Sequence, residues 1–276
     1  MTKREINIAH SPDSDDAFMF YALATNKVES EALAYRHHLS DIETLNRQAK
    51  EGVWDVTAIS FAALPYISEH YSLMPCGGSM GDGYGPLVVS GRKLSPEQLK
   101  GKKIAVPGML TSAFLSMKLY QPDFIPVVTP FDKIIEAVQQ GKVDAGLLIH
   151  EGQLTFGRDG LYRVVDLGRW WKDLYGLPLP LGGNAIRKDL RGPIGDEIAK
   201  ALRRSVRYAL DHRAEALTYA LQFARDMDPE LADRFIGMYV NDYTLDYGPQ
   251  GRESIVKFLQ LGYEKGFITQ KPQVEF

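Results

Sequence analysis

The sequence has 276 residues, of which 45% are hydrophobic and 24% are charged, so it can form one large or two small domains with a proper core. Its 32 basic and 35 acidic residues give a formal charge of −3 without a prominent basic tract, which makes nucleic acid a poor partner. Cys76 is the only cysteine, which excludes an intramolecular disulfide and a cysteine-based metal cluster within one chain.

The beginning of the chain predicts a cytoplasmic protein. A predicted strand starts almost at once, at Ile6, and the long apolar stretch of a secretory signal does not precede it. No run of the sequence approaches the roughly 18 apolar residues of a membrane span. We therefore expect a cytoplasmic location and no membrane partner.

Strands and helices alternate in the first part of the chain. Apolar runs and capping residues predict strands at residues 6–10, 33–39 and 54–59 and helices at residues 17–25, 41–52 and 60–64. This βαβαβ order implies parallel strand pairing with right-handed crossovers.

An acidic stretch, residues 13–16, separates the first predicted strand from the first helix. Ser14 or Asp15 can cap the helix, and acidic residues near its first turn complement the helix dipole. The same oxygens could instead bind a divalent cation. Because no glycine pattern of a calcium loop follows, we favour capping and predict no metal site.

Residues 77–85 are rich in glycine. They lack the Gly-Lys-Ser/Thr ending of a phosphate loop, and they lead into a predicted strand at residues 86–90 rather than a helix. A nucleotide cradle is therefore disfavoured, and we predict a flexible turn beside a ligand cleft.

The alternating pattern then restarts. Predicted strands lie at residues 103–106, 124–128, 143–149 and 161–167, and predicted helices begin at residue 96 and span residues 111–120 and 131–140. An extended segment at 177–184 leads into four helices at residues 193–211, 214–225, 229–239 and 251–265.

Two similar α/β units joined by two crossings predict a two-lobed molecule. The crossings are expected near Ser90 and Pro180, which we predict to form a hinge. The larger lobe then comprises residues 1–92 and 180–276, and the smaller lobe comprises residues 93–179. A cleft between lobes, as in solute-binding proteins, is a favoured ligand site.

His150 follows the predicted strand at residues 143–149, where open α/β sheets bind their ligands. An imidazole suits proton transfer near neutral pH, although His150 could simply hydrogen-bond the turn. Thr111 and Ser112 lie at a helix N-terminus, where hydroxyls and backbone N–H groups can hold a carboxylate or cap the helix. Asn46 and Ser60 face the same sheet edge, as cleft residues or as caps.

Several stretches, taken together and in order, resemble the 1,4-dihydroxy-6-naphthoate synthase family of the futalosine route to menaquinone. They are Ser11-Pro12 with Asp16-Ala17-Phe18-Met19-Phe20-Tyr21-Ala22-Leu23, Glu43-Thr44-Leu45-Asn46, Gly85-Pro86-Leu87-Val88-Val89, Val106-Pro107-Gly108 with Thr111-Ser112-Ala113, Ile149-His150-Glu151, and Leu177-Pro178-Leu179-Pro180-Leu181-Gly182. Each motif is weak alone, but their ordered combination covers nearly the whole chain.

The resemblance implies an α/β fold of the two-lobed type II periplasmic-binding-protein-like class. It implies a carbon–carbon lyase that converts cyclic dehypoxanthine futalosine to 1,4-dihydroxy-6-naphthoate without a metal or nucleotide cofactor. The position of His150 matches the family's proposed base. Thr111 and Ser112 would bind substrate oxygens, and Asn46 and Ser60 would line the cleft.

The first loop departs from the family pattern. The family usually reads Ser-Pro-Cys-Pro-Asn-Asp, whereas residues 11–16 here carry Asp13, Ser14 and Asp15 in place of cysteine, proline and asparagine. If this loop borders the ligand, its negative charge could disfavour a carboxylate substrate or select a variant one.

Two other functions remain open at the level of sequence. Chorismate dehydratase is a related enzyme of the same pathway and fold, and the Ile149-His150-Glu151 stretch argues against it. A cytosolic protein that binds a small carboxylate without catalysis would share the fold, because fold alone does not fix function. The expected partner in every case is a small-molecule carboxylate.

Overall fold

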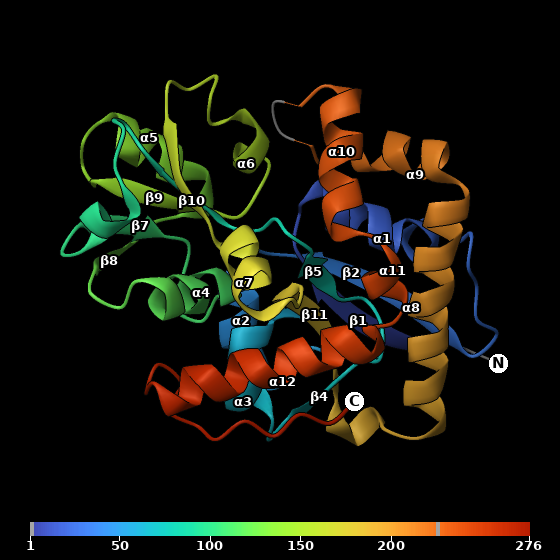
Figure 1. The fold of residues 1–276 in the computed structure, drawn as a ribbon. Coiled ribbons are helices and arrows are strands. Elements are labelled where there is room, and N and C mark those ends of the chain that lie inside the picture. Colours follow the sequence, from blue (N-terminus) through green and yellow to red (C-terminus); the bar gives the residue numbers. More distant parts are fainter. Residues whose placement is uncertain (1–2, 225–226) are drawn as a thin grey trace.

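The computed structural model describes residues 3–224 and 227–276, which form two sheets with flanking helices (Figure 1). The first sheet has six strands in the order β2-β1-β3-β11-β4, with β5 also paired to β11. The second sheet has five strands in the order β10-β6-β9-β7-β8. Each sheet is the centre of one lobe, and the green second lobe lies to one side of the first (Figure 1).

The first sheet combines the amino-terminal strands with one later strand. Its members are β1 (Arg4–His10), β2 (Leu33–Leu39), β3 (Val56–Ser60), β4 (Tyr71–Leu73), β5 (Ser79–Gly81) and β11 (Leu179–Arg187). β1 pairs in parallel with both β2 and β3, as the βαβαβ order predicts. The intervening α1 (Ser14–Ala24) and α2 (Ile42–Lys50) make these crossovers.

The second sheet repeats this arrangement. Its members are β6 (Leu87–Ser90), β7 (Lys103–Val106), β8 (Ile125–Val128), β9 (Ala145–Leu148) and β10 (Tyr162–Asp166). β7 pairs in parallel with β8 and β9, which confirms the second predicted parallel unit. The helices of this lobe are α4 (Ser112–Tyr120), α5 (Ile134–Gln139), α6 (Gly152–Thr155) and α7 (Leu167–Tyr175).

The remaining helices complete the first lobe. They are α3 (Leu64–Ile67), α8 (Pro193–Asp211), α9 (Arg213–Ala220), α10 (Pro229–Tyr239), α11 (Asp242–Leu245) and α12 (Gly248–Glu264). The apolar spacing along α8 predicts the side it buries, and Ile198, Leu202 and Val206 are indeed in the core, whereas Ile194 is only partly buried. Residue 225, the predicted end of the helix that follows α8, lies outside the described residues.

The chain crosses between the sheets at two adjacent places. It enters the second sheet between Gly81 and Leu87, earlier than the predicted crossing near Ser90, because residues 87–90 pair with β9 and β10. It returns at β11, close to the predicted crossing near Pro180. The first connection packs closely against α7, since a Cβ at Gly168 would lie only 1.8 Å from the carbonyl oxygen of Tyr84.

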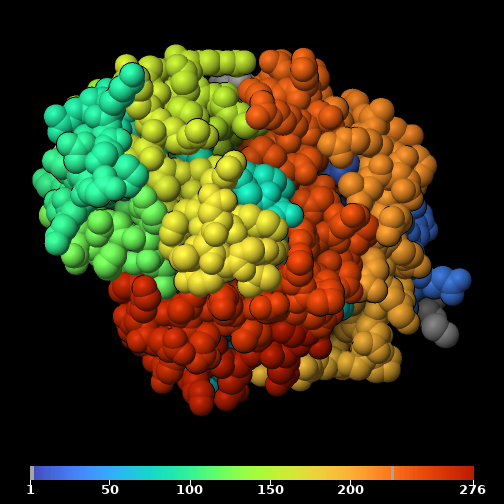
Figure 2. Space-filling model, viewed as in Figure 1, coloured from blue at the N-terminus to red at the C-terminus, as the bar shows by residue number. Residues whose placement is uncertain are grey.

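The lobes are in close contact on the face shown in Figure 2, where the green second lobe meets the red and orange helices of the first. In the described part of the chain, no helix is long and apolar enough to cross a membrane.

Candidate active site

A cavity of about 810 Å³, including its opening, lies between the lobes. Its walls come from the loop between β1 and α1, the ends of β3 and β9, the start of α4, and parts of β11 and α10. The carboxyl ends of β1, β3, β7 and β9 all point toward this region, as open α/β sheets require of a ligand site. Its size suits a small molecule.

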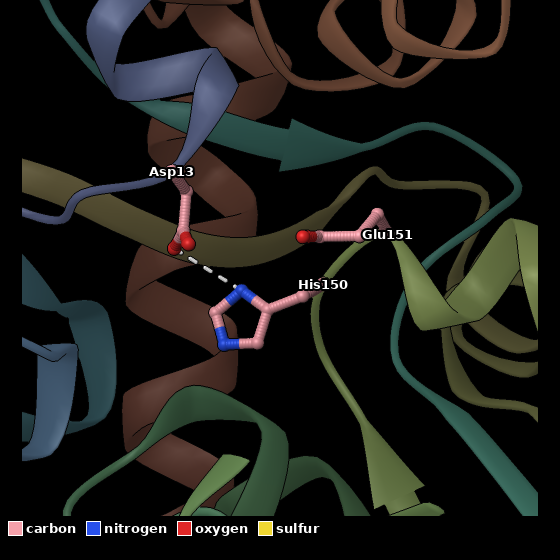
Figure 3. A group of neighbouring side chains, drawn as sticks. All are labelled: Asp13, His150 and Glu151. Carbon is pink, nitrogen blue, oxygen red and sulfur yellow. Dashed lines mark ion pairs between the residues drawn. The ribbon is translucent and has the colours of Figure 1, made fainter. Parts of the chain in front are cut away.

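His150 lies on the wall of this cavity, two residues beyond the end of β9. Its Nδ1 is 3.1 Å from Oδ2 of Asp13, which comes from the loop after β1 in the other lobe. The side chain of His150 is only 15% exposed, and the ring of Phe131 lies 4.0 Å from the imidazole ring, centroid to centroid. Figure 3 shows Nδ1 turned toward Asp13 and Nε2 turned away from it.

Asp13 occupies the position before α1 at which a capping side chain is expected. The sequence predicts Ser14 or Asp15 as the cap, but the N-cap residue is Asp13, and its side chain makes no capping hydrogen bond. Oδ2 of Asp13 instead accepts a 2.8 Å hydrogen bond from Oγ of Ser11 and faces His150. The loop is held from the other side by Asp16, whose Oδ2 accepts the backbone N–H of Ser11 at 2.8 Å.

Thr111 and Ser112 both line the cavity at the start of α4. The hydroxyl of Thr111 caps the helix, because it accepts the N–H of Phe114 at 3.1 Å and donates to the carbonyl of Gly108 at 2.9 Å. The hydroxyl of Ser112 accepts the N–H of Ala62, in the other lobe, at 3.2 Å. The start of α4 also offers backbone N–H groups of the kind that bind anions at helix N-termini.

Ser60 and Asn46 are joined to each other. Ser60 lines the cavity at the end of β3, whereas Asn46 is fully buried behind it in α2 and is absent from the cavity wall. Oδ1 of Asn46 accepts the N–H of Ser60 at 2.8 Å, and its Nδ2 donates to the hydroxyl of Ser60 at 3.1 Å. Asn46 therefore orients Ser60 instead of presenting its own amide to the cavity.

The Thr111→Ala variant should lose helix capping. Removing the hydroxyl leaves the N–H of Phe114 without its partner, so the free energy of unfolding should fall by about 1 kcal/mol, and KM should rise as the helix start loosens. Denaturant titration and steady-state kinetics measure the two effects. Thr218→Ala, on an exposed helical hydroxyl, is the matched control. Unchanged stability with weaker binding would instead assign the Thr111 hydroxyl to the substrate.

Glu151 lies on the same side of His150 as Asp13 in Figure 3. Three side chains here could together hold a metal ion, namely those of Asp13, His150 and Glu151. Each offers one ligand atom, and the three atoms lie within 4.8 Å of one another. The absence of a metal from the reaction stays a prediction.

The cavity wall carries acidic groups but, among the described residues that line it, no lysine or arginine. Burial raises the pKa of Asp16 to about 6, with the nearby charge of Asp13 contributing. Burial, together with the charges of Asp16 and Asp13, raises the pKa of Asp15 well above its usual range. Both carboxyls therefore hold their protons to higher pH than an exposed aspartate does.

Further contacts across the cavity hold the lobes closed. Glu43, in α2, accepts the N–H of Leu110 at 3.1 Å, and the hydroxyl of Tyr239 donates to Oε1 of Gln153 at 2.5 Å. Together with the Asp13–His150 pair, these contacts join the two lobes around the ligand space. The arrangement is that of two lobes drawn together around a cavity that keeps an opening to solvent.

A family model described as menaquinone biosynthesis matches residues 6–264. The chain belongs to the menaquinone biosynthesis family. It is 40% identical over 271 residues to the 1,4-dihydroxy-6-naphthoate synthase of Thermus thermophilus, with 98% of each chain covered. This relationship confirms the family resemblance found in the sequence motifs.

The solved structures agree with this membership of the menaquinone biosynthesis family. Protein AF1704 from Archaeoglobus fulgidus is 46% identical, with a TM-score of 0.92 over 96% of this chain and 98% of that one. A Candida albicans protein, described as having the generic periplasmic binding protein fold, is 13% identical with a TM-score of 0.73 over 100% and 99% of the two chains. The predicted two-lobed, periplasmic-binding-protein-like fold is confirmed.

Several residues that line the cavity were not predicted from the sequence as site residues. Asp13 was noted as part of the acidic stretch at residues 13–16 and as a departure from the family pattern, but not as a partner of His150, and Gln153 and Tyr239 were not singled out. A signal existed for Asp13, since a polar residue before a helix has two possible uses, capping or contact with a ligand. Gln153 and Tyr239 carried no signal, because their partnership joins α6 to α10, far apart in the chain.

Proposed function

We propose that the protein is a carbon–carbon lyase that converts cyclic dehypoxanthine futalosine to 1,4-dihydroxy-6-naphthoate, with His150 as the general base. The observation that carries the proposal is the position of His150, a largely buried imidazole on the wall of the cavity between the lobes. The close relationship to an enzyme named for this product, over nearly the full length of both chains, supports it. No metal or nucleotide cofactor is part of the proposal.

The proposed chemistry needs one proton acceptor and a closed site. Neutral His150 takes the proton of a substrate hydroxyl, and the resulting alkoxide collapses to a carbonyl while the neighbouring carbon–carbon bond breaks, in a retro-aldol-like step. The electron pair of that bond passes to the departing fragment. General base assistance of this kind contributes about 10²–10⁴ in rate.

The remaining groups bind and orient the substrate. The backbone N–H groups at the start of α4, beside Thr111 and Ser112, are suited to a carboxylate or another polar oxygen. Ser60, held by Asn46, presents a further hydroxyl to the same cavity. Closure of the lobes around the ligand removes water that would otherwise compete for these donors.

Incubation of the purified protein with cyclic dehypoxanthine futalosine tests the proposal. We expect release of 1,4-dihydroxy-6-naphthoate, detected by chromatography with mass spectrometry, in reactions without added metal. Saturable binding without turnover would contradict the proposal and favour a binding protein. Dehydration of chorismate, with futalosine derivatives left unchanged, would assign the protein to the related dehydratase.

A further inference from the structure

The contact between Asp13 and His150 has the geometry of an orienting carboxylate–imidazole pair. Oδ2 of Asp13 lies 3.1 Å from Nδ1 of His150, within hydrogen-bond distance. A carboxylate can only accept, so this contact requires the proton of the neutral imidazole to be on Nδ1. The lone pair is then on Nε2, the nitrogen that Figure 3 shows turned away from Asp13.

The surroundings of Asp13 hold its carboxylate in this orientation. Ser11 donates its hydroxyl to the same oxygen, Oδ2, at 2.8 Å, and the carboxylate is only 8% exposed. Asp13 stands at the N-cap position of α1 but makes no cap hydrogen bond, although aspartate is among the best capping residues. The side chain is thus turned from its usual local role toward His150.

On its other side the imidazole packs against an aromatic ring. Phe131, in the short helical turn Phe131–Lys133, has its ring centroid 4.0 Å from that of His150, at an interplanar angle of 57°. The carboxylate on one side and the ring on the other restrict rotation of the imidazole. A base that acts on a single substrate proton gains from such fixed geometry.

We infer that Asp13 is the positioning residue of His150: it fixes the Nδ1–H tautomer and the ring orientation, so that Nε2 is the atom that accepts the substrate proton. This inference deepens the proposed function and rests on it for its kinetic test. Asp13 and His150 come from different sheets, so the pair forms only when the lobes are closed. Lobe closure therefore aligns the base as well as enclosing the substrate.

Asp13→Ser separates positioning from folding. Serine is a good N-cap residue but is too short to reach His150, so α1 should keep its start while the carboxylate is lost. We expect unchanged or higher thermal stability, a fall in kcat of roughly 10²-fold or more, and a KM within about threefold of the native value. Asp13→Asn, which keeps the shape and removes the charge, is the second variant.

Asp144→Asn is the matched control. Asp144 lies at the opposite end of β9 from His150 and pairs with Lys102 on the surface. Its replacement removes one carboxylate charge, as Asp13→Asn does, without touching the cavity. We expect native kcat and KM for this variant. A native kcat in both Asp13 variants would overturn the inference, as would an increase in KM alone, because a structural latch between lobes predicts that pattern.

The tautomer can be read without any substrate. In protein labelled with ¹⁵N-histidine, the ring nitrogens of His150 are assigned by their disappearance in His150→Asn. At pH 8 we expect a protonated Nδ1 and an unprotonated Nε2 in the native protein, and a mixture of tautomers in Asp13→Ser. This readout stands even if the proposed reaction fails, so the two failures can be told apart.

Two results would overturn the inference, one from the spectra alone and one from the spectra together with activity measurements. The first is a native His150 that carries its proton on Nε2. The second is an Nδ1 without a proton, together with activity that falls on chelation and returns with Zn²⁺. That result would assign Asp13, with Glu151, to metal binding.

Discussion

His150→Asn should turn over cyclic dehypoxanthine futalosine at least about 10²-fold more slowly than the native protein, with its fold intact. Asparagine keeps some hydrogen bonding at this position but cannot accept a proton. His150 lies at the wall of a cavity, outside the apolar core, so its replacement leaves no large void. The loss should therefore appear in kcat, while substrate binding through α4 and Ser60 is retained.

The control for this variant is His212→Asn. His212 is exposed between α8 and α9, far from the cavity wall, where its Nδ1 contacts the carbonyl of Tyr208 and its ring stacks on that of Tyr208. Single-turnover kinetics with enzyme in excess separate the chemical step from product release. A folded His150→Asn protein with a native rate of that step would disprove the proposed base, whereas His212→Asn should be native in every respect.

The sequence predicted the elements that obey one strong local rule. α8 begins with a proline at its first position and keeps an apolar face, and its predicted bounds match the structure. β7 is a short apolar run between glycine and proline residues, and it too was predicted with its observed bounds. Parallel pairing followed from the alternation of strands and helices, because only a crossover can join such strands.

Elements that depend on distant partners were missed or displaced. β5 has three residues, within the stretch predicted as a flexible glycine-rich turn, and exists because β11 pairs with it. The first crossing was predicted late because a strand such as β6 carries no mark of the sheet it joins. The apolar pattern of β6 would be the same whichever of the two sheets it joined.

The candidate site shows the same division. His150 and Thr111 could be predicted because each adjoins the end of an element at the edge where ligands bind. The role of Asp13 could not, because it depends on which side chain of the other lobe faces it when the lobes close. Asn46 was predicted to line the cavity, but it lies behind Ser60. The sequence pattern indicates which edge of the sheet a residue adjoins, but it does not indicate how deeply the side chain is buried.

The acidic wall of the cavity should reduce stability as the pH rises through the interval from 3.8 to about 6. Burial raises the pKa of Asp16 to about 6, so the folded chain holds a proton that the unfolded chain has released. For an acid with a raised pKa, the penalty is absent below the unfolded value near 3.8 and complete above the folded value near 6. At about 1.4 kcal/mol for each pKa unit, the penalty at pH 8 is about 3 kcal/mol.

Two buried histidines act in the opposite sense. Burial lowers the pKa of His10 to about 3 and that of His37 to about 4, so both stay neutral in the folded chain. The unfolded chain binds protons first as pH falls below about 6.5, and stability is lost toward the folded values. The two histidine shifts together exceed the shift of Asp16, so the native protein should lose stability as the pH falls below about 6.5, and the carboxyl contribution offsets only part of that loss.

The Asp16→Asn variant should show how much the ionisation of Asp16 lowers the free energy of unfolding. Asparagine keeps an oxygen for the N–H of Ser11 and cannot ionise, so the variant should be more stable than the native protein by about 3 kcal/mol at pH 8 and by about half of that at pH 5. Urea titrations of both proteins at the two pH values measure the difference, in which the histidine contributions cancel.

Asp123→Asn, on an exposed carboxyl paired with Lys100, should change stability by less than about 1 kcal/mol at either pH. A stability gain for Asp16→Asn that is equal at pH 5 and pH 8 would show that Asp16 does not titrate in the raised range. A gain at pH 8 that is about twice the gain at pH 5 would show that the first turn of α1 keeps a carboxyl that opposes folding. Such a cost is expected where side chains are arranged for a ligand, next to the Asp13 that faces His150.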